Sequence, residues 1–216
     1  MGRDHTNEVY VWDPLVRVFH WALVVAFTIA FVTEDDALDL HVWAGYTVGA
    51  LVFLRIVWGF IGPEHARFSN FVYRPKAIME YIGSLLTFRA KRYLGHSPGG
   101  GAMVVVLLLS LAVTVASGIV VYGAEERAGP LAGFFAEQAV EMPFLTSPAR
   151  ASEDDEDEGE REGSESPLGE AMEEFHEFFA NFTLALVLVH VAAVLLASFV
   201  HRENLTKAMF TGYKRR

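Results

Sequence analysis

The chain has 216 residues, of which 52% are hydrophobic, and a mean hydropathy of +0.29. This is more apolar than one soluble core requires, and it favours a membrane protein. The sequence contains no cysteine, which excludes a disulfide, an iron–sulfur cluster and any thioether-linked cofactor. The formal net charge of −10 argues against nucleic-acid binding.

The apolar residues form four runs, at about 15–33, 40–61, 102–123 and 178–200. As a helix, each run is long enough to cross ~30 Å of hydrocarbon. The third and fourth runs lack the polar stripe that a helix in a soluble bundle would carry. We interpret the first run as a retained span because Arg17 and His20 interrupt it and no small-residue cleavage site follows. The sequence therefore predicts an all-α integral membrane four-helix bundle, a single domain over residues 1–216 that contacts membrane lipid.

The charges between the runs predict the orientation. Residues 62–99 contain six basic and two acidic residues, and residues 201–216 contain five basic and one acidic residue. These two segments share one side of a four-span protein, and by the positive-inside rule that side is the cytoplasm. We therefore expect a multi-pass protein of the cell inner (cytoplasmic) membrane with both termini cytoplasmic.

An acidic loop is expected on the outer side, at about residues 124–175. It contains six consecutive acidic residues from Glu153 to Glu158, and such a segment cannot bury enough apolar surface to fold alone. One interpretation is a solvated tether. The other is a landing site for a basic periplasmic cytochrome or oxidoreductase subunit, because clustered charge accelerates encounters with cationic proteins.

Four of the eight histidines lie on or at the ends of the apolar runs. Each of them alone is as readily explained as a hydrogen-bonded packing residue as it is as a ligand. As a set they satisfy a geometric condition, because His176 and His190 are fourteen residues apart. Fourteen residues are close to four helical turns, so both side chains leave the same face about 21 Å apart. One helix thus presents one imidazole near each membrane surface.

Depth in the membrane then pairs the histidines. The first run enters from the cytoplasm and places His20 on the inner side, whereas the second enters from outside and places His41 at the outer edge. The expected pairs are His20 with His190 and His41 with His176. Each pair can supply two axial imidazoles to one iron, so the sequence predicts two non-covalent heme b groups.

Two further residues of the second run fit this prediction. Gly45, four residues after His41, lies on the same helical face and leaves room for a porphyrin edge, although a small residue there also suits close helix packing. Arg55 lies fourteen residues after His41, at the depth of the inner heme. It is interpreted either as a propionate partner or as a residue that snorkels to the cytoplasmic surface.

Several segments resemble the bacterial cytochrome b561 family and the related cytochrome b subunits of nickel–iron hydrogenases. They are Arg17-Val18-Phe19-His20-Trp21, His41-Val42-Trp43-Ala44-Gly45 followed by Arg55, Gly95-His96-Ser97-Pro98, His176-Glu177 with His190, and His201-Arg202-Glu203-Asn204-Leu205. The resemblance implies that His20, His41, His176 and His190 ligate two b hemes. It also implies that His96 contacts quinone or propionates, with a loop-capping histidine as the alternative.

We therefore expect a di-heme b-type cytochrome that carries electrons between a quinone pool and an outer-side redox partner. The sequence leaves open whether the protein is itself a quinone-linked oxidoreductase. The alternative is a membrane-anchoring electron-transfer subunit of a periplasmic enzyme complex, such as a hydrogenase or a c-type cytochrome. A metal-ion transporter that uses the membrane histidines would need carboxylates beside them, and the four runs contain none.

Overall fold

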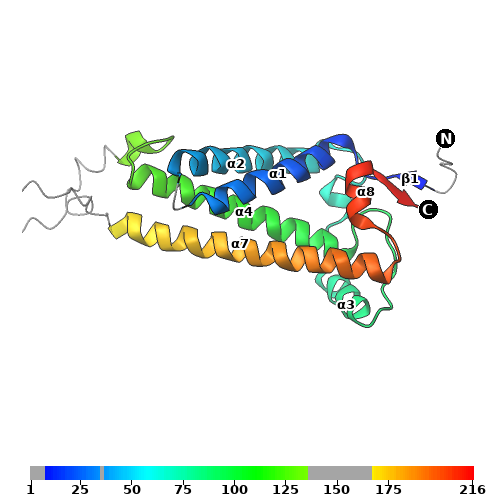
Figure 1. Ribbon diagram of the computed structural model, residues 1–216. Coiled ribbons are helices and arrows are strands. Elements are labelled where there is room, and N and C mark those ends of the chain that lie inside the picture. Colours follow the sequence, from blue (N-terminus) through cyan, green and yellow to red (C-terminus); the bar gives the residue numbers. More distant parts are fainter. Residues whose placement is uncertain (1–7, 35–36, 136–166) are drawn as a thin grey trace, which may run out of the picture. The chain divides into compact units, whose positions relative to one another are not determined.

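The computed structural model describes residues 8–34, 37–135 and 167–216, and within these it is mainly helical (Figure 1). The elements are β1 (Glu8–Tyr10), α1 (Pro14–Val32), α2 (Leu38–Ile61), the 3-10 turn η2 (Phe68–Asn70), α3 (Pro75–Leu86), α4 (Pro98–Ala124), α7 (Pro167–Val200), α8 (Leu205–Thr211) and β2 (Tyr213–Arg215). They form two compact units. The first comprises the chain up to Ala112 together with Phe182–Arg216, and the second comprises Val113–Asn181.

Four of these helices are long and apolar enough to cross a membrane, which confirms the predicted four spans. They are α1 with 19 residues, α2 with 24, α4 with 27 and the segment Leu168–Val200 of α7 with 33. Many large apolar side chains on them are exposed, as is expected of surfaces that face lipid. Examples are Val18, Phe53, Leu109, Leu188 and Phe199.

Two helix boundaries differ from the sequence prediction. Helix α4 begins at Pro98 rather than near residue 102, because Ser97 Oγ accepts a hydrogen bond from Gly100 N at 3.2 Å and caps the helix. Helix α7 begins at Pro167, so the expected outer loop of residues 124–175 is helical at its end. Its first turns are rich in Glu, Ala and Met, which form helix well but give no hydropathy signal. The acidic run from Glu153 to Glu158 lies outside the described residues.

Helices α1 and α2 lie side by side and pack through one face of α2 (Figure 1). Helix α1 starts at the Asp13 N-cap, whose side chain accepts from Val16 N at 3.1 Å. The buried residues of α2 recur every three or four positions and are Ala44, Val48, Val52, Arg55 and Gly59. This stripe buries one charged residue, Arg55, together with the apolar ones.

Short elements outside the spans complete the first unit, and the hydropathy pattern did not predict them. Strands β1 and β2 pair antiparallel with Val9 opposite Lys214, so segments from the two ends of the chain are joined. The Phe71 side chain is only 2% exposed, and Gly101 of α4 allows this approach because a Cβ there would collide with the Phe71 carbonyl.

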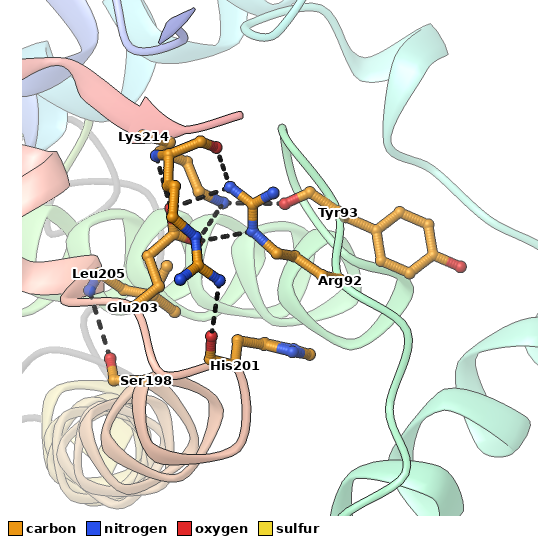
Figure 2. A network of polar contacts seen from close by, with 8 residues as sticks. Arg92, Tyr93, Ser198, His201, Glu203, Leu205 and Lys214 are labelled. Atoms are coloured by element: carbon orange, nitrogen blue, oxygen red, sulfur yellow. Dashed lines mark hydrogen bonds and ion pairs between the residues drawn. The ribbon is translucent and has the colours of Figure 1, made fainter. Parts of the chain in front are cut away.

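A buried ion-pair network holds the C-terminal segment in place (Figure 2). Arg92 Nε and Nη2 donate to the two carboxylate oxygens of Glu203 at 3.1 and 3.0 Å. Lys214 Nζ lies 3.8 Å from Glu203 Oε2 and donates to the Tyr93 carbonyl at 2.8 Å. The side chains of Glu203 and Lys214 are only 7% and 5% exposed. The network therefore links the loop after α3, the turn after α7 and β2.

This environment lowers the pKa of Glu203. Burial acts to raise it, but the hydrogen bonds from Arg92 and Arg215 and the charge of Lys214 together outweigh burial. A carboxylate whose pKa is depressed by folding stabilises the folded state above its ordinary pKa. That contribution is lost as the pH falls through the lower folded pKa.

We predict that Glu203→Gln lowers the free energy of unfolding by about 2 kcal/mol at pH 7, because it removes one partner of a buried charged network. The difference from the wild type should vanish in acid, below the folded pKa of Glu203. Thermal unfolding of detergent-solubilised protein, followed by tryptophan fluorescence, measures both effects. Glu80→Gln is the matched control, since Glu80 pairs with Lys76 on the exposed face of α3. An equal effect of the two substitutions would contradict the assignment.

Candidate heme sites

His20 of α1 and His190 of α7 face each other within the first unit. Their ring centroids are 6.4 Å apart, with an angle of 54° between the ring planes. The Nδ1 atom of His20 is buried and has no hydrogen-bond partner, and the edge of the Trp21 ring packs against the imidazole at 5.1 Å. The structure thus brings together the two histidines that depth had paired, while their role as ligands stays a prediction.

The spacing of this pair fits a metal ion between the rings. An imidazole nitrogen binds a first-row metal such as zinc at about 2 Å, and the ring centroid lies about 1 Å further away. Two imidazoles on opposite sides of one metal therefore have centroids about 6 Å apart. Rings that pack directly against each other would not need this separation. No hydrogen bond between the two rings is found among the residues that the structure describes. The residues present therefore fit bis-histidine ligation of an iron porphyrin.

The other two histidines, His41 and His176, belong to different units. His41 Nδ1 donates to the Ala30 carbonyl at 2.8 Å, across the turn between α1 and α2. His176 Nδ1 donates to the Thr114 carbonyl at 2.9 Å, with Ser117 Oγ 3.1 Å away. Gly118 makes room for this ring, since a Cβ there would lie 2.9 Å from His176 Cε1.

These hydrogen bonds have the same chemical consequence for both rings. A proton on Nδ1 that is donated to a carbonyl leaves the lone pair on Nε2, which is the tautomer that binds a metal through Nε2. Histidines that bind metals commonly donate their other ring nitrogen to a carbonyl in this way, which fixes the ring orientation and strengthens the ligand. The hydrogen bonds of His41 and His176 therefore fit the predicted ligand role.

Arg55 is enclosed within the first unit instead of extending to the membrane surface. The residue is 3% exposed, and its guanidinium lies 5.4 Å from the Phe68 ring centroid and 5.8 Å from that of Phe71. Its Nη1 atom is buried and has no hydrogen-bond partner. Cation–π contacts compensate part of the cost of burying this charge. The snorkelling interpretation is therefore disfavoured, and a buried donor remains for an anionic group.

His96 lies close to this guanidinium, between Trp12 and Phe71. Its ring centroid is 4.7 Å from that of Trp12 and 4.3 Å from that of Phe71, and its Nδ1 is buried without a partner. Burial, followed by the positive charge of Arg55, lowers the pKa of His96 to about 3. The ring is therefore neutral at physiological pH, and because Nε2 hydrogen-bonds to the His65 backbone, the partnerless Nδ1 carries a lone pair.

Gly45 of α2 borders open space. A Cβ built at this position would meet no atom within 4 Å, so close helix packing does not explain the glycine. Room for a flat group beside His41 is consistent with the sequence prediction. Among the described residues no group of three or more His, Asp or Glu side chains could hold a metal ion. Paired histidines suit a metal that brings its remaining ligands with it, as iron does in a porphyrin.

Sequence reasoning missed the residues that support these side chains. The carbonyl of Thr114 and the glycine at 118 lie in the third run, where only small and weakly polar residues mark them. The aromatic rings around Arg55 and His96 come from two separate segments, which only the fold brings together. The small and polar residues at 114–118 were the available signal, and it is weak.

Comparisons with known proteins agree with this geometry. A family described as prokaryotic cytochrome b561 matches residues 11–212. The probable Ni/Fe-hydrogenase B-type cytochrome subunit of Rhodobacter capsulatus is 28% identical over 54% of this chain, and the match spans 55% of that relative, about half its length. The protein of the same name from Cupriavidus necator is 25% identical over 96% of this chain and 87% of its own length.

No solved structure matches the chain significantly. The family match covers nearly the whole chain, including the four histidines and the four spans. The family carries heme b and transports electrons in membranes, and the structure supplies four apolar helices and the facing rings of His20 and His190. The chain belongs to the prokaryotic cytochrome b561 family.

Proposed function

We propose that this membrane cytochrome b binds two hemes and carries electrons across or within the cytoplasmic membrane, between a quinone pool and a redox partner on the outer side. The observation that carries the proposal is the facing pair of His20 and His190, with 6.4 Å between ring centroids. Heme iron, when bound, supplies one-electron redox chemistry, and the protein sets its position and potential.

The second heme is inferred from helix α7. His176 and His190 lie fourteen residues apart on this helix, which corresponds to about 21 Å along its axis. No single iron binds both, so each histidine needs a second ligand from another helix. We assign His20 to His190 and His41 to His176. The Nδ1 bonds of His41 and His176 to carbonyls support this, because they leave Nε2 as the ligand atom.

Arg55 and His96 are proposed to hold the anionic edge of the inner heme. Arg55 has a buried donor nitrogen without a partner, and the neutral His96 ring lies close to it. A propionate would accept hydrogen bonds from the Arg55 guanidinium and neutralise its buried charge. An anion near the iron favours the more positive ferric state, and the charge of Arg55 offsets this effect. These residues would therefore tune the redox potential of this site. Gly45 would admit a porphyrin edge at the outer site.

The orientation and the partners are also part of the proposal. The basic segments at 62–99 and 201–216 favour a cytoplasmic location for both termini, which puts the outer heme and the acidic segment on the periplasmic side of the inner membrane. The relatives are named as subunits of a Ni/Fe hydrogenase. An enzyme of this kind, or a basic periplasmic cytochrome, is therefore the proposed outer partner. If the chain serves such a complex as its membrane anchor, it should copurify with the enzyme.

The heme content tests the proposed function. Protein purified from heme-sufficient cells should show a reduced b-type spectrum, and a pyridine hemochrome assay should give two hemes per chain, because four ligand histidines form two sites. A stoichiometry of one heme would contradict the two-site assignment. A colourless preparation would contradict the ligand roles altogether.

Substitution of single histidines tests the pairing. His20→Ala and His190→Ala should each remove the same spectral and redox component, and His41→Ala and His176→Ala should each remove the other, because every heme loses an axial ligand. A double variant within one pair should resemble its single variants, whereas a double variant across the pairs should lose both hemes.

His201→Ala is the matched control for these variants. His201 follows the end of α7, eleven residues after His190 and about 100° from its face, so both hemes should be retained. The pairing is wrong if the His20→Ala protein keeps the component that is lost in the His190→Ala protein.

A further inference from the structure

A long apolar groove runs between α1 and α2, and α8 lines one end of it. Its volume is about 850 Å³, and its walls include Trp21, Val25 and Ile29 of α1, Leu40 and Trp43 of α2, and Phe210 of α8. All these residues belong to the first unit. The Trp21 and Phe210 rings are stacked with 4.2 Å between centroids, and they form the floor of the groove at the α8 end.

The groove adjoins the proposed inner heme site at Trp21, which lines the groove and also packs against the His20 ring. Its wall beyond Trp21 turns away from that site, since Val18 and Val25 lie about 140–160° around α1 from His20. They are 70% and 58% exposed. An apolar surface of this kind on a membrane-spanning helix faces lipid. An acyl chain along Val18 and Val25 would therefore enter from the bilayer and lie on the side of α1 opposite the His20 imidazole.

One charged residue, Arg17, lines this otherwise apolar groove. Its Nη1 donates to the Phe210 carbonyl at 2.5 Å, while its Nε is buried without an acceptor. Among the described residues, no carboxylate forms an ion pair with Arg17. The Trp21 Nε1 donor at the same end also lacks an acceptor. A cation without a counterion at the end of a membrane-spanning helix attracts an anionic group.

We propose that this groove binds an anionic phospholipid, with its phosphate at Arg17 and one acyl chain along α1. Arg17 lies in the first turn of α1, where a lipid headgroup is expected. From Arg17 to Ile29 the groove runs about 18 Å along the helix, close to the ~15 Å of hydrocarbon in one leaflet. A phosphate oxygen pairs with the guanidinium through charge-assisted hydrogen bonds. The proposal depends on membrane insertion and is independent of the heme assignments.

The chemistry of the walls favours a phospholipid over a quinone in this groove. Reduction of a quinone to a quinol takes two electrons and two protons. Apart from Arg17, the groove is lined by no residue that titrates, so no side chain there delivers a proton. A quinone head is also neutral and leaves the charge of Arg17 uncompensated. Occupation by quinone is therefore an outcome that the experiment must distinguish.

Native mass spectrometry of the purified holoprotein tests the proposal. The protein, in neutral detergent, is titrated with phosphatidylglycerol or with phosphatidylcholine of identical acyl chains. Phosphatidylglycerol should bind more tightly, and Arg17→Gln should weaken it about fivefold, since one basic residue near the surface contributes about that factor. Arg17→Lys should keep the preference for the anionic lipid. Val25→Trp, which fills the groove from an exposed position, should weaken both lipids.

Lys76→Gln is the control, because Lys76 is an exposed cation on α3 that pairs with Glu80, and it should leave binding unchanged. The visible spectrum of each variant checks that the fold is retained. Equal affinities for the two lipids in the wild type would overturn the proposal, and so would equal binding by wild type and Arg17→Gln. Either result would mean that lipid surrounds the protein without specific binding in the groove. Displacement of the lipid by a neutral ubiquinone analogue, with affinity unaffected by Arg17→Gln, would make the groove a quinone site and overturn the proposal.

Discussion

The arrangement depends on two imidazoles that face each other inside a membrane protein without touching. His20 and His190 come from helices α1 and α7, and their centroids are 6.4 Å apart. A polar ring inside a bilayer needs a partner, and at this separation the partner of each ring is best provided by a metal between them. We propose that an iron porphyrin provides this metal, because it would satisfy both rings at once.

Different groups in the fold orient the imidazoles and supply charge near the proposed hemes. The carbonyls of Ala30 and Thr114 orient the outer imidazoles, so turns and helix backbone set the tautomer without any charged residue. Within the first unit, the enclosed Arg55 provides a buried donor close to the neutral His96 ring. A buried cation is costly unless it is compensated, and we propose that heme propionates compensate it. The Glu203 network then fixes the C-terminal segment that covers this end of the first unit.

The sequence predicted the four spans and the proximity of His20 to His190, because hydropathy and helical spacing depend only on local residues. The early start of α7 was missed because its first turns are acidic, and hydropathy does not detect a helix of Glu, Ala and Met. The enclosure of Arg55 could not be predicted either: its position in α2 suited a snorkelling residue equally well, and the deciding rings of Phe68 and Phe71 come from a later segment. The ion pairs of Glu203 join residues more than a hundred positions apart, which spacing cannot reveal.

The central proposal is that His20 and His190 ligate one iron and that His41 and His176 ligate a second. An anomalous difference map, collected at the iron absorption edge from crystals of the purified holoprotein, tests it most directly. The account predicts two iron peaks per chain, one bonded to Nε2 of His20 and His190 and the other to Nε2 of His41 and His176. A single peak, or an iron whose axial ligands include any other side chain, would contradict it.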